Sequence, residues 1–116
     1  MKIFHIVERK FWNEQKRGES YSPISLKEQG FIHCSRADQI LEVANHLYKG
    51  NRNLIILRID QSKVKAEVVN EKPFETPHSI KDFPHIYGAL NFGAIEKEID
   101  FPCNSDGSFS LPDLLS

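Results

Sequence analysis

The chain has 116 residues, of which 40% are hydrophobic and 27% are charged. This length fits one domain over residues 1–116, and the composition is that of a globular protein, which excludes extensive disorder and collagen-like repeats. Lysine and arginine total 15, against 16 aspartate and glutamate residues. A dedicated duplex-binding protein usually carries a basic excess, so nucleic acid is not the expected partner, although these totals still allow a local basic groove.

The longest uninterrupted aliphatic run, from Leu54 to Leu57, is far shorter than a membrane-spanning helix. Residues 1–10 contain no apolar stretch long enough for a signal peptide. We therefore expect a cytoplasmic protein with no membrane partner. In that compartment Cys34 and Cys103 are expected to be free thiols.

The first part of the chain is predicted to form a strand, a helix, a short helical turn and a second strand, at residues 2–7, 8–17, 25–30 and 31–34. Ser25 and Glu28 have the spacing of a capping box at the start of the helical turn, and Gly30 is suited to end it. A longer helix is predicted to start at Ser35, whose hydroxyl would cap it, and to end at Gly50. Its expected buried stripe is Ile40, Leu41, Ala44, Leu47 and Tyr48.

The second part of the chain is rich in strand patterns. Residues 54–59 are nearly all apolar and predict a central strand covered on both faces, followed by a strand over 64–69. Three prolines within 72–84 indicate an irregular surface loop. Residues 85–87 and 92–99 are expected to pair with each other across 88–91, while 102–116 form a tail with no clear assignment. The predicted class is α+β.

Histidines mark the most informative segments. His33 and Ser35 lie where a predicted strand meets a predicted helix, a corner that favours an anionic ligand. The structural alternative is that His33 only satisfies a core hydrogen bond and Ser35 only caps the helix. His5 lies in the first strand, opposite in direction to Phe4, and His85 follows a proline at a strand entry. We expect the three histidines to meet at one cleft.

Other chemistries are less well supported by the residue pattern. A structural zinc site usually shows paired ligands close in sequence, and the adjacent His33 and Cys34 on a strand would point to opposite faces, so no metal is expected. A two-histidine phosphoesterase would need a second His-x-Ser/Thr element besides His33–Ser35. The letters of Tyr87–Leu90 match the Y-G-x-L loop of gamma-glutamyl cyclotransferases, but at the wrong place in the chain.

Several segments together resemble the small bacterial family called domain of unknown function 952. They are an early His-Ile, Trp12, Gly18-x-x-Tyr21, Leu26-x-x-x-Gly30-Phe31-Ile32-His33-Cys34-Ser35, Ala44-Asn45, Asp60, Glu71 and Phe83-Pro84-His85-Ile86-Tyr87-Gly88. The resemblance extends over nearly the whole chain to about Leu90.

This resemblance implies a fold similar to that of ADP-ribosyltransferases and the related RNA 2′-phosphotransferases, with a split, mostly antiparallel β core, two or three helices and a cleft for NAD. It implies that His5 holds the adenosine ribose, that 31–35 lies under the nicotinamide half and that a glutamate stabilises the transition state. The implied catalytic residues are Glu71 and His85. The implied ligand-binding residues are His5, Tyr21, His33, Ser35 and Tyr87.

Two functions therefore stay open. One is an enzyme, a transferase or glycohydrolase that takes NAD or a related ADP-ribose compound as substrate at the nicotinamide–ribose bond. The other is a noncatalytic module that uses the same cleft to bind a nucleotide or a protein. The arginine–histidine phosphate clamp of the RNA phosphotransferases has no counterpart at the amino terminus, and Arg58 is either a lone cationic contact or a partner of Asp60.

Overall fold

A computed structural model describes residues 1–73 and 81–116, and its strands form three antiparallel sheets. The largest sheet has the order β1-β4-β8, built from β1 (Lys2–Glu8), β4 (Leu54–Asp60) and β8 (Ile95–Phe101). The second has the order β3-β6-β5, built from β3 (Ile32–His33), β6 (Phe83–Tyr87) and β5 (Glu67–Glu71). The short strands β2 (Ser20–Tyr21) and β7 (Leu90–Asn91) pair with each other.

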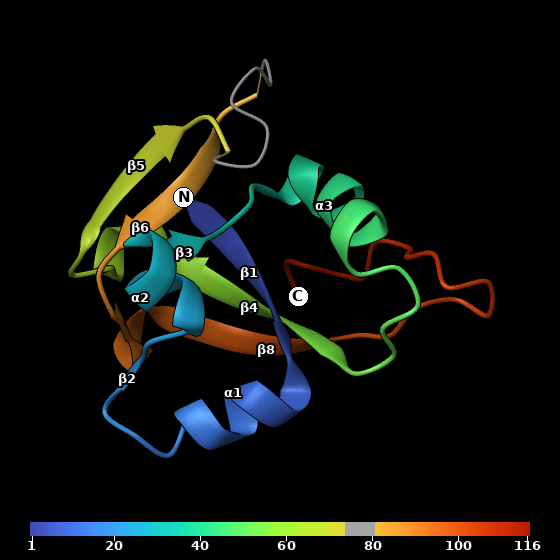
Figure 1. Cartoon of the computed structure of the whole chain (residues 1–116), viewed down its shortest axis with the longest axis horizontal. Coiled ribbons are helices and arrows are strands. Elements are labelled where there is room, and N and C mark those ends of the chain that lie inside the picture. Colours follow the sequence, from blue (N-terminus) through green and yellow to red (C-terminus); the bar gives the residue numbers. More distant parts are fainter. Residues whose placement is uncertain (74–80) are drawn as a thin grey trace.

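The helices of the described residues lie around these sheets. They are α1 (Arg9–Gln15), α2 (Ile24–Gln29) and α3 (Ile40–Leu47), with the single 3₁₀ turns η1 (Ala37–Gln39), η2 (Gln61–Lys63) and η3 (Phe92–Ala94). Figure 1 shows α1 at the end of β1, α2 on the side of the β3-β6-β5 sheet, and α3 on the opposite side with the carboxyl-terminal segment. The architecture is α+β with antiparallel sheets, as the sequence predicts.

Strand alternation divides the hydrophobic interior into two cores. Successive side chains of a strand point to opposite faces. Ile3 and Val7 of β1 therefore reach the first core, while Phe4 and Ile6 reach the second. β4 likewise sends Ile55, Leu57 and Ile59 into the first core and Leu54 and Ile56 into the second, which confirms the prediction of a strand covered on both faces. The predicted direction of His5, opposite to Phe4, follows from the same alternation.

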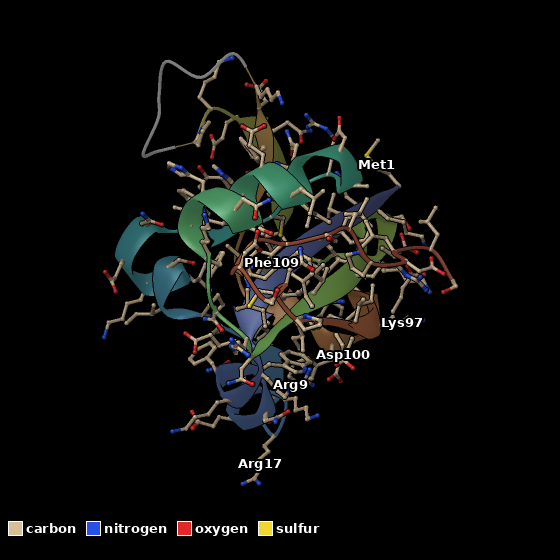
Figure 2. The ribbon with its side chains drawn as sticks, turned by 90° about the vertical axis from the view of Figure 1, so that its right-hand side faces the viewer. Met1, Arg9, Arg17, Lys97, Asp100 and Phe109 are labelled. Carbon is tan, nitrogen blue, oxygen red and sulfur yellow. The ribbon has the colours of Figure 1, made fainter. Side chains whose placement is uncertain are left out.

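The carboxyl-terminal residues complete the second core rather than forming a loose tail. Phe109 and Leu114 are buried there with α3. The Phe109 ring lies 4.8 Å from that of Phe101, and its N–H donates a 2.8 Å hydrogen bond to Asn45 Oδ1. Figure 2 shows Phe109 beside α3. Sequence patterning could not identify this segment because its anchoring residues are isolated and have no helix or strand period.

The predicted start of the long helix at Ser35 is wrong. The N–H and carbonyl of Ser35 both pair with Phe4, at 2.7 and 2.8 Å, so the residue stays extended as a bridge to β1. The chain turns only afterwards, where Gln39 Oε1 accepts the Arg36 N–H at 2.9 Å, and α3 begins at Ile40. Ile40 and Ala44 of the predicted stripe are buried, but Leu47 is 63% exposed.

The predicted capping box at Ser25 is also wrong. α2 has Pro23 at its N-cap, and the Ser25 hydroxyl donates instead to the carbonyl of Phe31 at 3.0 Å, since that carbonyl lies across the turn. The predicted stop is confirmed: Gly30 has φ +89° and its N–H bonds to the Leu26 carbonyl. This left-handed glycine reverses the chain from α2 directly into β3.

The pairing of the later strands differs from the prediction. β5 begins at Glu67 because η2 occupies the preceding turn, and β6 begins at Phe83, inside the predicted loop. Pro84 has no N–H to donate within β6, while its carbonyl accepts the Cys34 N–H at 3.0 Å. β6 pairs with β3 and β5, and β8 with β4, so the expected pairing of 85–87 with 92–99 is wrong. Residues 74–80 of the predicted loop lie outside the described residues.

Two further features of the described residues concern membrane-spanning helices and the cysteine thiols. Among the described residues, no helix combines the length and apolarity that crossing a bilayer requires. Cys34 is a buried free thiol and Cys103 a half-buried one. Burial raises the pKa of the Cys34 thiol, so this sulfur is protonated at neutral pH.

Candidate functional site

The outer face of the β3-β6-β5 sheet carries the polar residues that the sequence singled out. His33 of β3 pairs directly with His85 of β6, and Ile32 pairs with Ile86. The two isoleucines are fully buried in the first core. Since alternate residues face opposite sides of a sheet, both histidines point away from that core. The rings of His33 and His85 lie 5.4 Å apart in an edge-on arrangement.

Phe31 holds this histidine pair in place. Its ring stacks on that of His85, with centroids 4.1 Å apart and planes inclined by 16°. It also meets His33 edge-on at 4.8 Å and lies 5.4 Å from Tyr87. The sequence analysis placed Phe31 in a strand but assigned it no role. Its position two residues before His33, on the same strand face, was the available signal.

Glu71 of β5 connects to the same cluster. Its Oε1 accepts a 2.7 Å hydrogen bond from His85 Nδ1 and a second one from the Tyr87 hydroxyl. These two bonds, the Tyr87 bond first, lower the pKa of Glu71, so it is ionised at neutral pH. With Nδ1 donating to Glu71, His85 presents Nε2, which has no hydrogen-bond partner within the part of the chain that the structure describes.

His5 occupies a more enclosed position on β1. Its Nδ1 lies 2.5 Å from the His33 carbonyl, which only accepts, so Nδ1 carries the proton. Burial lowers the pKa of His5 to about 4, and the imidazole is neutral at neutral pH. Nε2 therefore accepts the hydroxyl proton of Tyr21 at 2.6 Å. Both ring nitrogens are engaged by protein groups, so His5 acts chiefly by fixing Tyr21 and the β3 backbone.

A cleft of about 510 Å³ joins these groups. It is bounded by β1, the start of α2, β3, α3 and β6, and its volume is in the range of small-molecule sites. Histidines 5, 33 and 85 all line it, which confirms the predicted convergence. The cleft lining also includes Glu8, Tyr21, Ile24, Ser35, Val43 and Leu47.

The seven residues singled out by the sequence fall into two groups. Five contribute to the lining of the cleft: His5, Tyr21, His33, Ser35 and His85. Glu71 and Tyr87 lie behind His85, which they contact through the shared Oε1. Gln29 was missed by sequence reasoning; its Oε1 accepts the His33 Nε2–H, and the four-residue spacing across the Gly30 turn was the only available signal.

The expected ligand role of Arg58 is not supported by its position. Its guanidinium lies 3.4 Å from Glu96 and donates to the carbonyls of Leu114 and Ser116, on the side of the carboxyl-terminal segment. Asp60 instead accepts from Ser62 at the start of η2. No group of three or more metal-ligating side chains is clustered within residues 1–73 and 81–116.

Comparison with solved structures finds the same fold in a protein from Caulobacter crescentus called CC0527. Its crystal structure matches with a TM-score of 0.80 and 26% sequence identity, covering 96% of this chain and 95% of that one. Its solution NMR structure matches with a TM-score of 0.72 and 27% identity, covering 99% and 97%. Comparison with curated proteins finds no match. The profile of the DUF952 family, described as proteins of unknown function, matches residues 6–98, and the chain therefore belongs to this family.

Proposed function

We propose that the cleft binds a small molecule of nucleotide type, with NAD or an ADP-ribose compound as the first candidates, and that His85 transfers a proton at the bound ligand. The observation that carries this proposal is the contact between Glu71 and His85 at the cleft wall. An ionised carboxylate fixes Nδ1–H of the imidazole, and the second nitrogen has no protein partner among the described residues. A carboxylate that orients a histidine in this way is a common arrangement for general acid–base chemistry.

The candidate reaction is hydrolysis of the nicotinamide–ribose bond. The bond between C1′ and nitrogen breaks with its electron pair passing to nicotinamide, and the oxygen of water bonds to C1′. His85 Nε2 accepts the proton of that water and returns it to solvent. Glu71 stabilises the resulting imidazolium through Nδ1–H, so in this scheme Glu71 is a positioning residue rather than one that touches the sugar.

Other residues at the cleft have side chains that could bind the sugar and a planar ring of such a ligand. Ser35 is buried and lines the cleft, and its hydroxyl has no hydrogen-bond partner among the described residues. Such a hydroxyl can donate to, or accept from, a ribose hydroxyl. His33, which also lines the cleft, packs edge-on against the ring of Phe31, and this pair of rings is suited to contact a planar ring of the ligand. These contacts support binding independently of catalysis.

A noncatalytic ligand-binding module is the second candidate. It is favoured by the position of Glu71, whose carboxylate is not part of the cleft lining and so does not reach a sugar directly. In this case His85 would serve as a hydrogen-bonding group for the ligand and no bond would be cleaved.

The two candidates separate in one set of measurements. Binding of NAD and ADP-ribose is measured by calorimetry, and nicotinamide release by chromatography. For the enzyme, His85→Gln is expected to lower the release rate by about 10²- to 10⁴-fold, with a smaller loss for Glu71→Gln. Glu67→Gln removes an exposed carboxylate from the same strand and is the matched control with an unchanged rate.

The outcomes are distinct. Binding with no nicotinamide release supports the noncatalytic module. Release that is equally fast in His85→Gln contradicts the assigned role of His85. Absence of both binding and release refutes the proposal of a nucleotide-type site.

A further inference from the structure

We infer that the cleft recognises the phosphate-free nucleoside part of its ligand and leaves any phosphate groups outside in solvent. This inference rests on the proposed function and specifies which part of a nucleotide the site selects. It follows from the charges that surround the cleft and from the side chains at its rim.

The first observation concerns the cations that could hold a phosphate. Within the described residues, no lysine or arginine contributes to its lining, and the segment 74–80 contains neither residue type in its sequence. Three basic residues next to lining positions form ion pairs with carboxylates that do not line the cleft: Arg9 lies 2.5 Å from Asp100, Lys72 lies 3.3 Å from Asp82, and the Arg36 guanidinium lies 3.9 Å from Asp38. Phosphate groups in protein sites are usually held by arginine, lysine or several backbone N–H groups, because their desolvation must be compensated.

The described lining of the cleft includes a carboxylate, that of Glu8, whose negative charge repels a phosphate group. Glu8, at the end of β1, contributes to the lining and is exposed. His5 is held neutral by burial, so it adds no positive charge. A diphosphate placed within the cleft would therefore lose water and face a carboxylate, and both effects oppose binding.

The rim of the cleft is apolar on two sides. Ile24 of α2 is 69% exposed and Leu47 of α3 is 63% exposed, and both line the cleft. Large aliphatic side chains that are exposed beside a concave site favour the flat or apolar part of a ligand, which they shield from water. Together with Val43 inside the cleft, they suit a heterocyclic ring better than a charged group.

The polar groups are those that recognise hydroxyls. Tyr21 and Ser35, which carry hydroxyl groups, line the same cleft as His85. Tyr21 donates its proton to His5, so its oxygen presents lone pairs that accept from a ligand hydroxyl. Hydroxyl groups of this kind bind ribose hydroxyls, and they carry no charge that could neutralise a phosphate.

The test compares matched ligands with increasing phosphate content. Calorimetry or NMR titration uses adenosine, AMP, ADP and ADP-ribose in one series and nicotinamide riboside, its mononucleotide and NAD in the other. In the series that binds, we expect dissociation constants within about threefold of one another, unchanged between about 20 and 200 mM salt. Affinity that rises about tenfold or more with each phosphate, or that falls steeply with salt, overturns the inference while keeping the proposed function.

A designed cation gives an independent check. Leu47→Lys places an ammonium group at the rim, at an exposed position where folding is not at risk, and is expected to make the phosphorylated ligand bind about three- to tenfold tighter than its nucleoside. Leu111→Lys is the matched control, since Leu111 is 49% exposed and is not part of the cleft lining. An equal effect of both variants contradicts the inference. Absence of binding in both series refutes the proposed function and this inference with it.

Discussion

Lowering the pH from about 7.5 to about 5 is expected to remove roughly 2 kcal/mol of folding stability through His5 alone. Burial holds the pKa of His5 at about 4 in the native state, whereas the ordinary value is 6.5. Between these two pH values the unfolded chain binds a proton at His5 that the native protein does not bind. The free energy of unfolding therefore falls as the pH is lowered from 6.5 to about 4. Each pH unit inside that window costs about 1.4 kcal/mol, and stopping at pH 5 keeps most carboxylates ionised.

The assay is urea unfolding at the two pH values, compared with His5→Asn. Asparagine lacks a titratable group, and its side-chain N–H can replace the bond from Nδ1 to the His33 carbonyl. The variant is expected to be less stable at both pH values, because the Tyr21 hydroxyl loses its acceptor, but to lose about 2 kcal/mol less between them. An equal pH dependence in both proteins would refute the reasoning.

An NMR titration of the imidazole provides a second measurement that needs no variant. The ring nitrogens of His5 are expected to show the neutral form with the proton on Nδ1 down to about pH 5. Protonation near the ordinary value of 6.5 would show that burial does not control this group, and the stability argument would fail with it.

Three further predictions concern the cleft, the thiols and the second core. His33→Gln is expected to change stability little and to weaken ligand binding by about ten- to a hundredfold; a large stability loss with unchanged binding would assign His33 a purely structural role. Thiol titration of the unfolded, unreduced protein is expected to find both cysteines reactive, with Cys34 protected from reagent in the native protein by burial; a count of zero after unfolding would indicate a disulfide. Phe109→Ala is expected to cost about 3–5 kcal/mol in urea unfolding, because the ring is 5% exposed and packs on Phe101, and a cost near zero would show that the carboxyl-terminal segment does not support the core.

Local sequence signals predicted those elements whose geometry depends on neighbours along the chain. The apolar run that became β4 and the left-handed Gly30 needed no long-range information. Ser35 could not be predicted, because its backbone pairs with Phe4, thirty-one positions earlier, and that pairing overrides its preference for a helix N-cap. The partner of β6 was missed for the same reason: Ile86 is buried between Ile32 and Val68, and no local spacing encodes that choice.

The sequence predicted which residues belong to the candidate site, but not the hydrogen bonds that connect them. The alternation within β1 and the motif around His33 indicated which side chains leave the core. The bonds that define their roles, from His5 to Tyr21 and from His85 to Glu71, join residues 16 and 14 positions apart on different elements. Only the folded arrangement shows that His5 is hydrogen-bonded at both nitrogens, whereas among the described residues His85 is hydrogen-bonded at Nδ1.

The division of the interior into two cores has a consequence for the energetics of binding. β1 forms one wall of the cleft, and its Phe4, which does not line the cleft, packs with α3 and the carboxyl-terminal segment in the second core. If the cleft binds the proposed ligand, we expect neither the backbone of this wall nor the orientation of His5 to change, because both ring nitrogens of His5 are already hydrogen-bonded. Little of the interaction free energy would then be needed to order the protein. Amide hydrogen exchange in β1 should accordingly be nearly the same in the free and the bound protein.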